Sequence, residues 1–181
     1  MEAARGGRPL GALVDALAAA RIGETFNQYR RSRLLRDRLE SYLERKRHAS
    51  VVLVGEAAGY RGARVSGVPF TSERQLTGRG PAEATATIVH RVLAELGVED
   101  DALLWNVVPT HPHEPGRPYT NRRPSRFEVD VSFRFLEGAA HGRRLIAVGR
   151  LAQEVTAAPY VRHPSHGGAA AFRAGLAALL G

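Results

Sequence analysis

A glycine-rich segment carries the first residues of the chain that could do acid–base chemistry. The segment extends over residues 55–80, with Glu56 directly after Gly55 and Glu73 further along. Glycine lets backbone approach a ligand, and carboxylates in a cleft can accept a proton or position a water molecule. The segment contains neither Gly-x-Gly-x-x-Gly nor Gly-Lys-Ser/Thr. It is a candidate for acid or base work, and an ordinary turn with surface acids is the alternative.

An asparagine and several histidines come next. Asn106 ends an apolar run, and its amide offers both a donor and an acceptor, which suits reading the edge of a base; capping the following turn is the alternative. His111 and His113 lie in the loop beyond it. Together with His163 and His166 they could bind a metal ion, but no carboxylate is in register with them. We therefore expect no metal.

The last polar segment, residues 163–168, reads His-Pro-Ser-His-Gly-Gly. His163 can donate a hydrogen bond to a developing anion, and Ser165 with the backbone N–H groups of Gly167 and Gly168 can hold a phosphate at a helix entrance. A purely structural turn is the alternative. Ser165 has no acid–histidine relay in the sequence, which disfavours a hydrolase triad.

The elements that position these residues are predicted by apolar patterning. Short β-branched and apolar runs predict buried strands at Val51–Val54, Leu103–Asn106 and Leu145–Val148, with a weaker strand at Tyr160–Arg162. Helical spacing predicts helices near residues 10–20, 33–47, 82–96, 126–136, 151–157 and 170–180. Strands that alternate with helices in this way indicate an α/β fold of three layers (α/β/α) with a central four-stranded, mostly parallel sheet.

The length of 181 residues fits a single domain, with residues 1–50 as an N-terminal helical segment and residues 51–181 as the α/β core. The polar segments 55–80, 107–123 and 163–168 all follow predicted strands. Because the carboxyl ends of parallel strands form the ligand crevice of open α/β folds, these segments should meet in one cleft.

Charge and composition indicate what kind of partner the protein binds and exclude several kinds of site. The chain has 26 basic against 18 acidic residues, a net charge of +8, and all but one of the basic residues are arginine. Such an excess favours a polyanion such as nucleic acid. The lack of cysteine excludes disulfides and cysteine-ligated iron–sulfur clusters. No apolar run is long enough to span a membrane, and residues 1–8 do not resemble a secretion signal, so we expect a cytoplasmic protein.

Taken together, the order of these motifs resembles the uracil-DNA glycosylase superfamily over about residues 51–180. Residues 55–59, Gly-Glu-Ala-Ala-Gly, resemble the Gly-Glu-Ala-Pro-Gly of its family 4 branch. The unbroken spacing to residues 67–73, Gly-Val-Pro-Phe-Thr-Ser-Glu, resembles the type-b branch. Asn106 matches the asparagine that reads uracil, and residues 163–165 match the final His-Pro-Ser motif.

The sequence departs from the family pattern at two positions of the first motif. Ala58 replaces the usual proline, and Ala57 stands where the best-known branch has a catalytic aspartate. The acid that positions water must therefore come from elsewhere. Glu56 matches the family 4 acid and Glu73 the type-b acid, and both stay open.

The resemblance implies an enzyme that hydrolyses the N-glycosidic bond of uracil, or of a related deaminated or modified base, in DNA without a cofactor. Its implied catalytic residues are Glu56, Glu73 and His163, its base-binding residues are Ala57, Gly59, Phe70 and Asn106, and its phosphate-binding residues are Ser165, Gly167 and Gly168. Phe70 would stack on the base. The best-known branch has a tyrosine at the Gly59 position that excludes the 5-methyl of thymine, so glycine there implies a broader substrate range.

The expected partner is single-stranded DNA or damaged duplex, bound by a monomer that repairs DNA in the bacterial nucleoid, with no membrane involved. Two alternatives remain. A DNA-binding or lesion-sensing module could keep the fold without turnover, and Ala57 and Ala58 are consistent with that. A hydrolase of free nucleotides or nucleosides could use the same crevice, but the net charge of +8 disfavours it.

Overall fold

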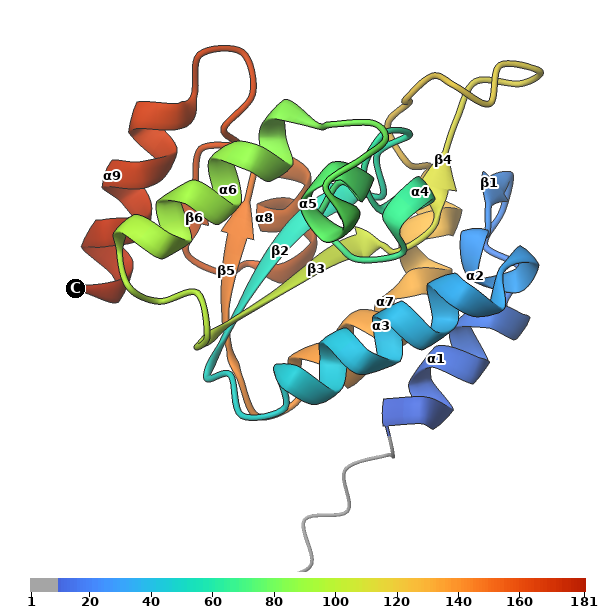
Figure 1. The fold of residues 1–181 in the computed structure, drawn as a ribbon, viewed down its shortest axis with the longest axis horizontal. Coiled ribbons are helices and arrows are strands. Elements are labelled where there is room, and N and C mark those ends of the chain that lie inside the picture. Colours follow the sequence, from blue (N-terminus) through green and yellow to red (C-terminus); the bar gives the residue numbers. More distant parts are fainter. Residues whose placement is uncertain (1–9) are drawn as a thin grey trace, which may run out of the picture.

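Four parallel strands form the central sheet (Figure 1). The computed structural model describes residues 10–181; residues 1–8, on which the expectation of no secretion signal rests, lie outside the described part. The strands are β2 (Val51–Ala57), β3 (Ala102–Val108), β5 (Arg144–Val148) and β6 (Tyr160–Val161), in the order β3-β2-β5-β6. The α/β class and the four-stranded parallel sheet are therefore confirmed.

All of the predicted helices are present within a few residues of their expected ends. They are α1 (Leu10–Ala19), α3 (Arg33–Arg45), α6 (Ala84–Glu95), α7 (Arg126–Ala140), α8 (Arg150–Thr156) and α9 (Ala169–Leu180). The short helices α2 (Gln28–Arg31), α4 (Ala63–Ser66) and α5 (Glu73–Thr77) were not predicted, because a single turn is too short to show a helical period. No helix within residues 10–181 is long and apolar enough to cross a membrane.

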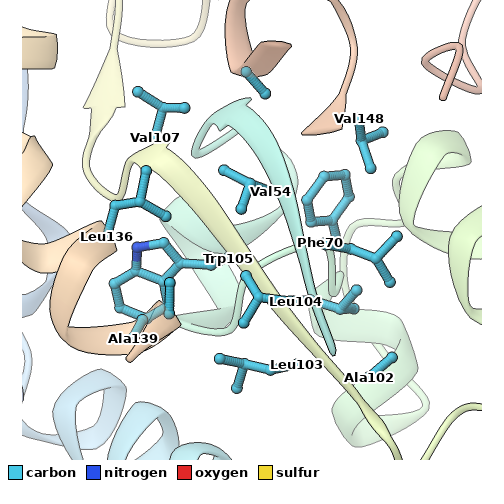
Figure 2. Close-up of a cluster of buried hydrophobic side chains, with 14 of the residues drawn as sticks. Val54, Phe70, Ala102, Leu103, Leu104, Trp105, Val107, Leu136, Ala139 and Val148 are labelled. Atoms are coloured by element: carbon cyan, nitrogen blue, oxygen red, sulfur yellow. The ribbon is translucent and has the colours of Figure 1, made fainter. Parts of the chain in front are cut away.

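Side-chain alternation along β3 fixes which residues face which layer. Every residue of β3 is buried, and Trp105 is completely so. Figure 2 shows Trp105 beside Leu136 and Ala139 of α7, whereas Leu104 points to the opposite side of the strand, where Phe70 lies. Because strand side chains alternate in direction, Asn106 belongs to the same side as Leu104. The strand thus places its one amide on the Phe70 side of the sheet.

A second sheet ties the N-terminal segment to the core. The antiparallel strands β1 (Thr25–Phe26) and β4 (His111–Pro112) pair Phe26 with His111. Thr25 Oγ1 also lies 2.6 Å from Thr110 Oγ1. Strands of two residues carry no readable alternation, so the sequence did not predict this sheet. Its consequence is that Thr25 and Phe26 lie against the loop that follows β3.

Glu128 joins the same two segments through a buried ion pair. The side chain is 2% exposed, and Arg122 donates to it from both guanidinium nitrogens at 2.6 and 2.8 Å. The backbone N–H groups of Glu24 and Ser125 donate to the same carboxylate. Burial alone would raise the pKa of Glu128, but the hydrogen bonds from Arg122 and Ser125 outweigh it and leave the pKa below its ordinary value.

We predict that Glu128→Ala lowers the free energy of unfolding by about 3 kcal/mol, because it leaves the Arg122 guanidinium and two backbone donors without their acceptor. Urea denaturation at neutral pH measures this loss. Asp130→Ala on the same helix is the control: Asp130 pairs with Arg126 at 4.0 Å, and 68% of its side chain is exposed. Asp130→Ala should lower the free energy of unfolding by less than about 0.5 kcal/mol. Equal losses of stability in the two variants would contradict the proposed contribution of the buried pair.

The contribution of Glu128 should also depend on pH. Because the folded-state pKa is lowered, the stabilisation is fully present above the ordinary value of 4.5 and is lost as the pH falls through the lower folded-state pKa. The difference in unfolding free energy between the wild type and Glu128→Gln should therefore shrink in acid. A difference that stays constant down to acid pH would contradict the assignment.

Candidate active site

A cavity of about 480 Å³ lies at the carboxyl edge of the central sheet. Residues from all three polar segments line it, among them Glu56, Ala57, Gly59, Phe70, Asn106, Pro112, His163, Ser165 and His166. The segments thus meet as their topology predicted, because parallel strands deliver their carboxyl ends to one edge.

Gly55 lies next to both the Phe70 ring and the Asn106 amide of the cavity. It pairs with Asn106 across β2 and β3. A Cβ atom at Gly55 would lie 2.2 Å from the Phe70 ring and 3.0 Å from Asn106 Oδ1. The sequence analysis assigned this glycine to ligand approach; the structure shows that it makes room for the Phe70 ring.

Phe70 is held in a constrained loop. Its φ of +51° lies in the left-handed region, which is unfavourable for an aromatic residue. The loop is fixed on both sides, since the buried Ser66 hydroxyl donates to the Thr71 carbonyl oxygen at 2.6 Å and accepts from the Val68 N–H at 3.1 Å. The surrounding bonds therefore hold the ring in its place at the cavity.

Asn106 is 3% exposed, and its amide forms no hydrogen bond with any of residues 10–181. A buried amide normally finds partners, so an open one at a cavity wall is suited to bind a ligand. The amide can donate to one ligand atom and accept from a neighbouring one.

Ser165 fixes the tautomer of His163. The Ser165 backbone N–H donates to His163 Nδ1 at 3.2 Å, and the Ser165 hydroxyl lies 2.7 Å from the same nitrogen. An Nδ1 that accepts a hydrogen bond leaves the proton of the neutral ring on Nε2. Burial, with a smaller contribution from His166, lowers the pKa of His163. The site therefore presents a neutral imidazole with an Nε2–H donor.

The glycines of this segment do not have the predicted arrangement. The Gly168 N–H donates to the Ser165 carbonyl oxygen at 3.0 Å, so it is not free to hold a phosphate. A Cβ atom at Gly168 would lie 2.1 Å from the His163 carbonyl oxygen. Gly168 therefore permits close backbone packing beneath His163, and its role in phosphate binding stays a prediction. Gly167 is exposed at a φ of +75°, outside the cavity lining.

The two candidate acids are separated by the structure. Glu56 lines the cavity, and partial burial, to which Glu154 adds and which Arg123 opposes, raises its pKa although the residue keeps solvent contact. Glu73 lies outside the cavity lining and accepts two hydrogen bonds from Arg38, at 2.8 and 3.0 Å. Glu73 was expected to work in the cleft, whereas Arg38 of α3 binds it outside the cavity lining; its catalytic role stays a prediction.

Glu83 is a cavity residue that the sequence analysis missed. It lines the wall next to Gly59 and Gly62, and a Cβ atom at Gly59 would lie 2.3 Å from Glu83 Oε1. Burial raises its pKa. The gap expected at Gly59 is therefore occupied by a carboxyl group. Glu83 is the N-cap residue of α6 and lies three residues after the segment 55–80, outside the motifs that were singled out.

Asn121 and Arg122 were also missed. Both line the cavity. Asn121 Oδ1 accepts a hydrogen bond from the Tyr60 N–H at 3.1 Å, which joins the loop after β4 to the loop after β2. Arg122 forms the buried ion pair with Glu128. Their only sequence signal was their place in a polar segment that follows a strand.

The histidines considered as metal ligands make different contacts. His111 is buried, with its ring nitrogens 2.8 Å from the Ala58 carbonyl oxygen and 3.2 Å from that of Pro118. It therefore fastens the loop after β4 to the end of β2. Within the described part of the chain, no group of three or more His, Asp or Glu residues could hold a metal ion.

A model of the Uracil DNA glycosylase superfamily matches residues 43–175, which span β2, β3, β5, β6 and the whole cavity. The chain belongs to this superfamily. Among solved structures, wild-type Pedobacter heparinus SMUG2 matches with a TM-score of 0.70 at 10% sequence identity, over 94% of this chain and 96% of that chain. At this identity the likeness shows a shared fold. No curated protein matches the chain.

Residues 10–42 lie before the matched superfamily region. They nevertheless contact the region around the site, since Thr25 of β1 pairs with the cavity-lining Pro112 and Arg38 binds Glu73 outside the cavity lining. The segment before the matched region therefore holds one carboxylate, that of Glu73, in an ion pair with Arg38.

We predict that nitrogen NMR finds His163 neutral at pH 7 with its proton on Nε2, and that the ring titrates with a midpoint below the ordinary 6.5. The reason is that burial disfavours the imidazolium and the Ser165 N–H occupies the Nδ1 lone pair. A midpoint at or above 6.5, or a proton on Nδ1, would contradict the assigned state.

Proposed function

We propose that this protein is a DNA glycosylase that hydrolyses the N-glycosidic bond of uracil, or of a related deaminated or modified base, in DNA. The observation that carries the proposal is the convergence of Phe70, Asn106, His163 and Glu56 on one cavity. An aromatic ring, an open amide, a fixed imidazole donor and a carboxylate are the groups that base excision requires. Membership of the superfamily and the charge of +8 support DNA as the substrate.

Binding begins with the extruded base. Its face stacks on Phe70, and its polar edge exchanges hydrogen bonds with the Asn106 amide, which has no partner within the described chain. Because the base must leave the helical stack, the constrained Phe70 loop supplies a preformed surface that replaces part of the lost stacking. This step selects a pyrimidine-like edge.

Bond cleavage places opposite charges on the two fragments. The bond between the sugar C1′ and the base nitrogen breaks, its electron pair goes to the base, and the sugar becomes oxocarbenium-like. His163 donates from Nε2 to the base oxygen on which negative charge develops. A neutral donor suits this role because the Ser165 bonds hold its geometry before the reaction.

Water completes the reaction. The water oxygen attacks C1′, and a carboxylate that lines the cavity accepts the proton that the water loses. The negative charge of this carboxylate also offsets the positive charge of the sugar. Glu56 is the candidate from the superfamily motif, and Glu83 is the second carboxyl group in the same cavity. The raised pKa of Glu56 makes it a stronger base than an ordinary glutamate once it is ionised.

We predict that Asn106→Ala and Glu56→Gln each lower the rate of uracil excision by at least about a hundredfold while the fold persists, because each removes a positioned group. Glu73→Gln is the matched control: it should change the rate by less than about threefold, since Glu73 lies outside the cavity. The measurement is strand cleavage after alkali treatment of a uracil-containing oligonucleotide. A silent Glu56→Gln with an inactive Glu83→Gln would move the basic role to Glu83.

The same assay separates the alternative functions. Cleavage supports the glycosylase, whereas retention of the oligonucleotide without cleavage supports a lesion-binding module. Failure to bind or cleave it would support an enzyme of free nucleosides. Near-wild-type excision by Asn106→Ala would contradict the proposed base pocket.

We predict that Glu83 sets the substrate range, because its carboxyl group fills the space beside Gly59 where the best-known branch has a tyrosine. Glu83→Ala should raise excision of 5-substituted uracils relative to uracil by about tenfold or more. Relative rates on uracil, 5-substituted uracils, thymine mispaired with guanine, and hypoxanthine measure this. Unchanged relative rates in Glu83→Ala would show that this wall does not contact the base.

A further inference from the structure

Two arginines and two aromatic rings alternate in a stack that the excision mechanism does not use. The Arg31 guanidinium carbon lies 5.8 Å from the centre of the Phe26 ring. The Arg64 guanidinium carbon lies 5.1 Å from the Phe26 ring centre and also 5.1 Å from that of Tyr119. We refer to Arg31, Phe26, Arg64 and Tyr119 as the arginine–aromatic ladder.

The ladder adjoins the mouth of the cavity. Phe26 is held by the β1–β4 pairing, next to the register position of the cavity-lining Pro112. Arg64 directly follows Ala63, which lines the cavity. Tyr119 lies two residues before the cavity-lining Asn121. A strand that places one nucleotide in the cavity therefore passes within reach of the ladder.

The charges of the ladder are not neutralised within the described chain. No acidic side chain of residues 10–181 forms an ion pair with Arg31, Arg64 or the nearby Arg61, whereas Arg38 and Arg122 each bind a glutamate. Arg61 stacks on Tyr60 in the same region, at 5.3 Å. Arg64 Nε is buried and has no hydrogen-bond partner. Such a surface is complementary to an anion.

The Tyr119 ring of the ladder is exposed to solvent. Tyr119 is 69% exposed, which is the largest exposed fraction among the large hydrophobic side chains of the described chain. The Arg64 guanidinium beneath it restrains a ring that would otherwise turn freely. An open, restrained aromatic face beside unpaired arginines is the combination that binds bases by stacking and phosphates by charge.

We propose that the arginine–aromatic ladder binds an unpaired nucleotide that flanks the target in the same DNA strand. The flanking base stacks on Tyr119, and Arg31 and Arg64 contact the adjacent phosphates. Bases inside a duplex already stack on their neighbours, so the ladder engages single-stranded DNA more strongly than duplex. The inference deepens the proposed function and rests on DNA as its substrate.

The test is binding of a uracil-free single-stranded oligonucleotide, measured by fluorescence anisotropy. Tyr119→Ala should weaken binding at least about fivefold, because aromatic stacking on single-stranded bases is removed. Tyr119→Phe keeps the ring and should bind within about twofold of wild type. Phe133→Ala is the control, since Phe133 is an exposed ring on α7 outside the ladder, and it should not change binding.

Two further probes separate stacking from charge. On a single-stranded oligonucleotide of the same length whose nucleotides are all abasic, wild type and Tyr119→Ala should bind equally, because no base is present to stack. On the matching duplex the two proteins should also differ by less than about twofold. Arg31→Gln should reduce the salt dependence of single-strand binding by about one counterion, which Arg91→Gln on α6 should not do.

The inference would be overturned if Tyr119→Ala lost the same affinity on normal and abasic strands. It would also be overturned if Tyr119→Ala bound the normal strand as tightly as wild type does. These outcomes are distinct from failure of the proposed function. A wild type that binds through Tyr119 but excises no base contradicts the glycosylase and leaves the ladder standing. Excision that depends on Asn106, together with unchanged binding by Tyr119→Ala, contradicts the ladder alone.

Discussion

The parallel pairing of Gly55 with Asn106 is the constraint on which the site depends. Side chains alternate along a strand, so a shift of this register by one residue would turn the Asn106 amide to the α7 side, among Trp105 and its neighbours. Gly55 contributes by having no side chain, which lets the Phe70 ring and the amide share the space above it. The buried β2 and β3 strands hold that register because both are apolar along almost their whole length.

Electrostatic pairing decides which acidic groups face the cavity. Glu73 and Glu128 are each bound by two guanidinium nitrogens, from Arg38 and Arg122 respectively, so both serve the fold. Glu56 and Glu83 lack such partners and lie at the cavity, where burial raises the pKa of each. Burial favours the protonated forms of Glu56 and Glu83, and a carboxyl group with a raised pKa is a stronger base once it is ionised.

The N-terminal segment extends the superfamily core toward the site. It supplies Arg38 to Glu73, Phe26 and Arg31 to the ladder, and a backbone N–H to Glu128. Apart from the stacking of Arg31 on Phe26, which lies within the segment itself, these contacts are made to residues of the matched region 43–175. Through Phe26 the segment adds one aromatic ring to the surface beside the cavity, where the matched region already supplies Tyr60 and Tyr119.

The sequence by itself determined the class of fold and the place of the site. Apolar strand runs that alternate with amphipathic helices are local patterns, and they specify a parallel sheet whose carboxyl edge gathers Glu56, Asn106 and His163. Only the tertiary structure placed Glu56 in the cavity lining and Glu73 outside it, and put Glu83 beside Gly59. Those outcomes depend on contacts between residues tens of positions apart, such as Arg38 with Glu73. Long-range pairing of this kind leaves no period or motif in the chain, because it arises only when packed elements bring distant side chains together.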